Sequence, residues 1–183
     1  IYIGGNDSMD TIKKLSDYAI VFGHSIRFIG CPKTIDNDLA LTDHTPGYGS
    51  AAKYIGTSMK EIIRDSFCLE YEKGVVSIVE IMGRDAGWLA ASSCVLRANG
   101  EPAPHLIYLP ESTFTLEQYI QDVKNAMTRY KAVIIAVSEG VTFPDGGSEE
   151  QAKDAFGHTQ NAGIGKKLEE YTAKHFQCKV RSI

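Results

Sequence analysis

The stretch Cys31-Pro32-Lys33-Thr34-Ile35-Asp36-Asn37-Asp38 directly follows an apolar run at residues 26–30. That run is expected to form a short buried strand, because apolar and small residues are bounded there by turn formers. A lysine, a threonine hydroxyl, an amide and two carboxylates follow it within six residues. In a parallel α/β sheet, catalytic and binding groups gather at the carboxyl ends of the strands. A helix-capping turn would need only one such polar residue, so the stretch indicates a functional site.

The rest of the chain alternates apolar strands with amphipathic helices. The expected strands cover residues 1–3, 26–30, 74–81, 105–109, 132–137 and 178–183. The expected helices cover residues 9–18, 47–65, 86–98, 115–130 and 163–176, and a turn-rich surface loop is expected at 144–154. This alternation predicts an α/β fold, a three-layer α/β/α Rossmann-like sandwich with a mainly parallel sheet. We expect it to be truncated at both ends, because Ile1 and Ile183 lie inside predicted strands and domain boundaries fall in exposed linkers.

Two local expectations concern the first helix and two aromatic residues. Any of residues 6–8, an asparagine, an aspartate and a serine, can cap the helix expected at 9–18. The glycine turn before them joins a strand to a helix, a layout that presents free backbone amides to a phosphate. Tyr48 and Trp88 are most simply explained as core or packing residues.

Composition excludes several classes of function. A formal net charge of -4 argues against a nucleic-acid-binding protein, which would need a basic face. No apolar run reaches the roughly 20 residues of a membrane-spanning helix, so we expect no membrane partner. The four cysteines are scattered, without metal-finger spacing. Reduced thiols in a cytoplasmic enzyme are therefore expected.

Five segments resemble the phosphofructokinase family, in the right order and over almost the whole chain. They are Gly4-Gly5-Asn6-Asp7-Ser8, Pro32-Lys33-Thr34-Ile35-Asp36-Asn37-Asp38, Thr45-Pro46-Gly47-Tyr48-Gly49-Ser50-Ala51-Ala52, Glu80-Ile81-Met82-Gly83-Arg84-Asp85-Ala86-Gly87-Trp88 and Val137-Ser138-Glu139-Gly140. The second is similar to the catalytic loop of the family's pyrophosphate-using branch. The resemblance implies a phosphotransferase of glycolysis that moves a phosphoryl group, reversibly and with Mg²⁺, from pyrophosphate to the 1-hydroxyl of fructose 6-phosphate.

The resemblance implies roles for the residues of this loop. Asp36 matches the family's catalytic aspartate and would accept the proton of the sugar hydroxyl. Asp38 would support it, because side chains two residues apart in an extended stretch face the same way and neighbouring carboxylates raise one another's pKa. Thr34 and Ile35 belong to the substrate-binding segment. Thr34 and Asn37 either form hydrogen bonds with the substrate or lock the loop.

Two positions indicate pyrophosphate as the phosphoryl donor. Lys33 stands where ATP-dependent relatives carry a glycine, and its ammonium would stabilise the transferring group. Asp7 also replaces a glycine of those relatives, and its carboxylate would crowd and repel the α-phosphate region of a nucleotide. The simpler interpretations are a surface lysine and a helix cap.

The remaining site residues follow two later strands. Met82, Gly83 and Arg84 match the family's sugar-phosphate segment, with Arg84 as a second transition-state cation. The alternative for Arg84 is a structural ion pair with Glu80 or Asp85. Glu139 would accept hydrogen bonds from sugar hydroxyls.

Asn6 is the candidate metal ligand. Many relatives carry an acidic residue there, whereas Asn6 offers one neutral oxygen. Mg²⁺ prefers carboxylates, phosphates and water, so pyrophosphate itself would hold most of it.

The expected domains are residues 1–44, part of the phosphate-donor domain with the catalytic loop, and residues 45–183, an incomplete fructose 6-phosphate-binding domain.

The resemblance implies a homodimer or homotetramer, because relatives complete the sugar site across a subunit interface. An ATP-dependent enzyme and a non-catalytic sugar-phosphate-binding fragment are the alternatives. The glycine-rich phosphate loop and the later basic segment of the family are not found, so these 183 residues alone should turn over little. No G-x-G-x-x-G motif supports dinucleotide binding.

Overall fold

A computed structural model describes residues 1–69, 72–144 and 163–183. The surface loop predicted at 144–154 lies, except for Pro144, outside the described residues. Along the chain the elements are β1 (Tyr2–Gly4), α1 (Asn6–Val21), β2 (Gly30–Pro32), α2 (Tyr48–Cys68), β3 (Val75–Ile81), α3 (Trp88–Ser92), α4 (Val95–Ala98), β4 (Leu106–Tyr108), α5 (Leu116–Met127), β5 (Ala132–Ser138), α6 (Ile164–His175) and β6 (Lys179–Ser182). None of the described helices is both long and apolar enough to cross a membrane.

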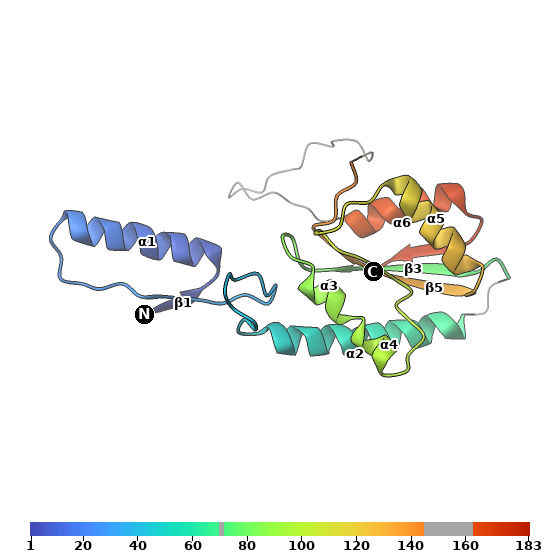
Figure 1. Cartoon of the computed structure of the whole chain (residues 1–183), viewed down its shortest axis with the longest axis horizontal. Helices are drawn as coiled ribbons and strands as arrows, with labels where there is room; N and C mark the ends of the chain where they lie inside the picture. Colours follow the sequence, from blue (N-terminus) through green and yellow to red (C-terminus); the bar gives the residue numbers. More distant parts are fainter. Residues whose placement is uncertain (70–71, 145–162) are drawn as a thin grey trace.

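The main sheet has four strands in the order β4-β5-β3-β6, and all of its pairings are parallel. Helices α2, α3 and α4 cover one face, and α5 and α6 cover the other (Figure 1). The predicted α/β/α sandwich with a mainly parallel sheet is therefore confirmed. In this arrangement the carboxyl ends of β3, β5 and β4 lie side by side at one edge of the sheet.

The two central strands explain why the sheet forms. All of β5 is buried, and β3 is buried except at the half-exposed Glu80. Their near-continuous apolar sequence fits strands covered on both faces. Toward α5 and α6 the core contains Val76, Ile78, Val133, Ile135, Val137, Tyr119, Val123 and Leu168. Toward α2, α3 and α4 it contains Val79, Ile81, Ile134, Ala136, Met59, Ile63, Leu89 and Leu96.

The first elements form a separate arrangement at one end of the molecule (Figure 1). Strands β1 and β2 pair in parallel. Among the described helices, they pack mainly against α1. The prediction of a buried strand at 26–30 is wrong, because the strand is Gly30–Pro32 while Ile26 and Ile29 are 64% and 59% exposed. A two-stranded sheet covered by one helix cannot bury the run, whatever its apolar content. The predicted division between residues 44 and 45 stays a prediction.

The predicted cap of the first helix is also wrong. Helix α1 begins at Asn6, so residues 6–8 are already helical, and Gly5 is the N-cap residue without a side-chain hydrogen bond. Gly5 has no side chain that could bond to the amides of the first turn. Backbone N–H groups at a helix start are suited to an anionic ligand.

The helix expected at 86–98 is divided into α3 and α4. The break falls at Ser93 and Cys94. The buried Ser93 hydroxyl donates to the carbonyl of Ala90 at 2.6 Å. A serine that bonds back to the preceding turn competes with the backbone and bends or ends a helix.

Candidate active site

The loop that follows β2 is anchored at its base to both neighbouring parts of the fold. The backbone N–H of Lys33 donates at 3.0 Å to the carbonyl of Gly4, the last residue of β1. Thr34 forms an isolated parallel bridge with Gly47, directly before α2. The Thr34 hydroxyl also accepts the backbone N–H of Asp36 at 3.0 Å. These contacts fix the start of the loop and the direction of Asp36.

Asn37 locks the rest of the loop. It has a positive φ of 60° and is only 7% exposed, a backbone conformation that asparagine tolerates better than most residues. Its Nδ2 donates to the carbonyl of Asp43 at 3.1 Å, and its Oδ1 accepts the backbone N–H of Thr45 at 2.9 Å. These bonds favour the loop-locking alternative for Asn37. The two candidate catalytic aspartates therefore flank a fixed residue.

The pKa of the Asp36 carboxyl is raised above its ordinary value. Burial raises its pKa most, nearby Asp38 and Glu139 raise it further, and Arg84 lowers it. Its Oδ1 is buried and has no hydrogen-bond partner among the described residues. The structure therefore brings together these four predicted residues, from the loop and from the ends of β3 and β5. An aspartate with a raised pKa accepts a proton more readily than an ordinary one.

The turn after β3 is held against the end of β5. Gly83 has a φ of 138°, which a residue with a side chain rarely adopts. Its N–H donates to Glu139 Oε1 at 3.1 Å, and its carbonyl accepts the hydroxyl of the buried Ser138. Met82, 55% exposed, precedes this turn at the surface. Sequence reasoning missed Ser138, although its position beside Glu139 at a strand end was a signal.

Arg84 is the exposed cation of this turn. Its Nε lies 3.4 Å from Asp85 Oδ2, and both side chains are largely exposed. An exposed ion pair of this kind contributes little stability, so it does not fix the guanidinium. The other predicted ion-pair partner, Glu80, instead accepts the N–H groups of Gly163 and Gly165 at 3.2 and 2.8 Å. Arg84 therefore remains suited to a phosphate ligand.

The predicted donor residues lie around the start of α1. A Cβ placed on Gly5 would lie 4.0 Å from Lys33 Nζ, so the ammonium stands beside the glycine turn. Asn6 and Asp7 are exposed residues of the first turn of α1. The amino end of a helix attracts anions through its free N–H groups and its dipole. A lysine at that end therefore adds to an existing preference for phosphate.

The described residues hold no group of three or more His, Cys, Asp or Glu side chains suited to a metal ion. Asn6 alone offers a single neutral oxygen, which is a weak ligand for Mg²⁺. This donor set does not form a protein cage for the ion. Mg²⁺ therefore stays a prediction.

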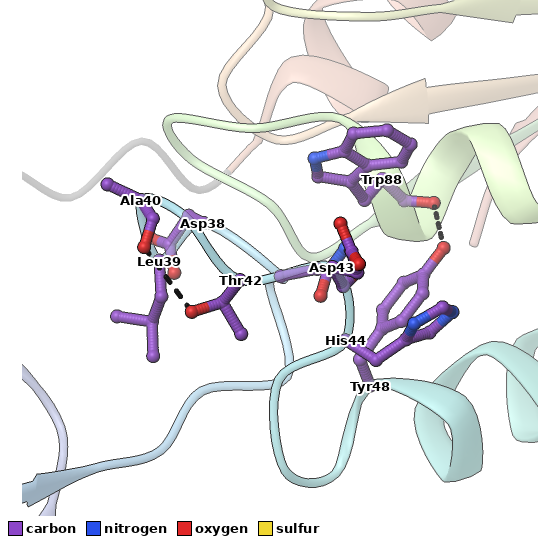
Figure 2. A pocket seen from close by; sticks show the side chains of 9 residues that line it. Asp38, Leu39, Ala40, Thr42, Asp43, His44, Tyr48 and Trp88 are labelled. Atoms are coloured by element: carbon purple, nitrogen blue, oxygen red, sulfur yellow. Dashed lines mark hydrogen bonds between the residues drawn. The ribbon is translucent and has the colours of Figure 1, made fainter.

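A cavity of about 700 Å³ opens beside the loop, lined on its two sides by Asp38 and Trp88 (Figure 2). The Tyr48 hydroxyl donates to the carbonyl of Trp88 at 3.4 Å and joins α2 to α3. Trp88 is 52% exposed, so the prediction of a core position is wrong for this residue. Tyr48 is partly buried and packs against the core. Trp88 is the first residue of α3 and lines the cavity, whereas the next two residues, Leu89 and Ala90, are buried.

Known proteins match the chain along its length. The family model described as phosphofructokinase matches residues 1–183. Pyrophosphate--fructose 6-phosphate 1-phosphotransferases of Xanthomonas campestris and Rhodospirillum rubrum are 39% and 41% identical over 98% and 90% of the chain. The chain spans 44% and 41% of their lengths. A crystal structure of a pyrophosphate-dependent phosphofructokinase from Marinobacter aquaeolei superposes with a TM-score of 0.78 at 35% identity, over all of this chain and 42% of that one.

Proposed function

The chain belongs to the phosphofructokinase family, and from this premise we propose that the protein transfers a phosphoryl group from pyrophosphate to the 1-hydroxyl of fructose 6-phosphate. The products are fructose 1,6-bisphosphate and orthophosphate. One observation carries the proposal: Asp36, with its raised pKa, lies close enough to Asp38, Glu139 and Arg84 for their charges to act on it. The names of the similar relatives support this choice of substrates.

The acceptor half of the reaction uses the strand ends of the main sheet. Asp36 takes the proton from the 1-hydroxyl while that oxygen bonds to the terminal phosphorus of pyrophosphate. The P–O bond to the departing orthophosphate breaks in the same step. Glu139 keeps one carboxylate oxygen on the Gly83 N–H, which leaves the other to accept a sugar hydroxyl. Arg84 neutralises charge on the transferring group.

The donor half uses the start of α1. Pyrophosphate lies against the glycine turn, where the helix amides and Lys33 attract it. The position of Lys33 Nζ beside Gly5 supports this. Asp7, in the first turn of α1, would repel the additional phosphate of a nucleotide. Lys33 thus favours pyrophosphate, and Asp7 disfavours ATP.

Three further features belong to the proposal. Mg²⁺ would be held mainly by the oxygens of pyrophosphate, with Asn6 as a minor ligand. The protein acts as a homodimer or homotetramer, as the resemblance to the family implies, because relatives complete the sugar site across a subunit interface. It works in the cytoplasm, where its four free cysteines stay reduced.

The test offers pyrophosphate and ATP separately to the whole protein, with fructose 6-phosphate as acceptor, and measures fructose 1,6-bisphosphate. We expect turnover with pyrophosphate and almost none with ATP. Lys33→Gly should lower the pyrophosphate rate by about 10²-fold, because a transition-state cation is lost. Turnover with ATP instead would refute the steric reasoning at residues 7 and 33, and the absence of any sugar phosphorylation would refute the function.

A further inference from the structure

The loop from Gly83 to Gly87 carries Arg84 between two fixed ends. At its first end, Gly83 is bonded to Ser138 and Glu139 at the end of β5. A third contact, from the Gly140 N–H to the Gly83 carbonyl at 3.3 Å, closes this end. The first end is therefore held by three groups of one strand end.

The second end is held by a different strand. The N–H of Gly87 donates to Glu111 Oε1 at 2.8 Å. A Cβ on Gly87 would lie 2.9 Å from side-chain atoms of Leu109, Pro110 and Glu111, so this contact is as close as a glycine permits. Glu111 follows β4 by three residues, and β4 pairs with β5. The loop from Gly83 to Gly87 is therefore anchored at one end to the end of β5 and at the other to the segment that follows β4.

We propose that Glu111 is a positioning residue of the phosphotransfer reaction, which holds Arg84 in place by accepting the N–H of Gly87. This inference rests on the proposed function and extends it to a residue outside the segments of sequence resemblance. Glu111 is exposed over much of its surface. Its charge is therefore solvated, and the effect comes from the geometry of one hydrogen bond.

The two ends of the loop should affect different kinetic constants. Met82 and Gly83, which seat the sugar, lie at the end that Ser138 and Glu139 hold. Losing Glu111 leaves that end intact and frees the end that follows Arg84. A cation that acts on the transferring phosphoryl group would then be misplaced while the sugar still binds. The expected result is a lower kcat with an almost unchanged KM for fructose 6-phosphate.

The experiment compares three variants of the whole protein. Glu111→Ala removes the hydrogen-bond acceptor, and Glu111→Gln keeps an acceptor oxygen while removing the charge. Glu117→Ala, at an exposed residue in the first turn of α5, removes the same charge nearby. We expect Glu111→Ala to lower kcat about tenfold with KM changed less than about twofold. Glu111→Gln should restore kcat to within about threefold of the original protein, and Glu117→Ala should leave both constants unchanged.

The result that overturns the inference is equally specific. Glu111→Ala with unchanged kcat, Glu111→Gln as impaired as Glu111→Ala, or a rise in KM instead of a fall in kcat would each contradict it. Hydrogen–deuterium exchange at the Gly87 amide gives a readout that does not depend on turnover. It should rise in Glu111→Ala and not in Glu117→Ala. If the original protein phosphorylates no sugar, the proposed function fails by itself, and unchanged exchange would still refute the hydrogen-bond role separately.

Discussion

Gly140 offers the sharpest test of how closely the loop that carries Arg84 packs against the end of β5. A Cβ on Gly140 would lie 2.5 Å from the carbonyl carbon of Arg84 and 2.9 Å from its Cα, and closer still to its carbonyl oxygen. All three are backbone atoms, so no side chain can rotate out of the way. In Gly140→Ala the backbone of Arg84 has to move by about 1 Å or more, and a misplacement of 1 Å can cost about 10²-fold in rate.

The assay is pyrophosphate-dependent phosphorylation of fructose 6-phosphate by the whole protein, with kcat/KM compared between variants. We expect Gly140→Ala to lose about 10²-fold in kcat/KM. Gly56→Ala is the matched control, because Gly56 lies inside α2 and a Cβ there would contact nothing within 4 Å. That control should keep full activity. A folded Gly140→Ala protein with the original kcat/KM would show that the turn adapts freely, and the reasoning about Arg84 would be wrong.

Three other predictions concern the catalytic loop. In Asp38→Asn a negative neighbour of Asp36 is lost, so the pKa of Asp36 falls; the acid limb of the pH profile of kcat/KM should move to lower pH, and an unmoved limb contradicts this. Asp36→Asn should lose about 10²–10⁴-fold in kcat. Because the pKa of Asp36 is raised by folding, its charged form destabilises the folded state as pH rises through that pKa. The neutral variant should therefore unfold at a higher temperature at neutral pH, by roughly 1–2 °C because burial is partial, and a lower Tm by calorimetry would refute the sign. Asn37→Ala removes the partners of the Thr45 N–H and the Asp43 carbonyl, and urea unfolding should show a loss of about 1–3 kcal/mol; an unchanged midpoint would mean that the loop is held elsewhere.

The central sheet could be predicted from sequence because its signal is local. Residues 75–81 and 132–138 are nearly continuous apolar runs between turn formers, and each became a buried parallel strand. The run at 26–30 carries a similar signal but remains exposed at Ile26 and Ile29. Burial depends on what packs against a strand, and β2 has one strand and one helix beside it. The local sequence pattern carries no information on how many elements pack against a strand.

Sequence context likewise predicts some residues of the candidate site and not others. The residues proposed to carry the chemistry, such as Asp36 and Glu139, follow strands and are predicted from their sequence context. The residues that hold the backbone of the site could not. Ser138 bonds to Gly83 from 55 positions away, and Glu111 bonds to Gly87 from 24 positions away. Such bonds exist only because β4, β5 and β3 are neighbours in the sheet, and strand order cannot be derived from the spacing of residues.

The position of the catalytic loop explains why so many of its bonds are structural. Lys33 stands at the start of α1, whereas Arg84 and Glu139 stand at the edge of the main sheet, and the loop joins these two parts (Figure 1). In-line transfer between a donor held by one part and an acceptor held by the other requires that their separation be fixed, since effective concentration falls steeply with misalignment. The bond from Lys33 to Gly4, the bridge between Thr34 and Gly47 and the two bonds of Asn37 fix that separation. In the proposed reaction Asp36 therefore acts as the base from a loop that joins the donor part to the acceptor part.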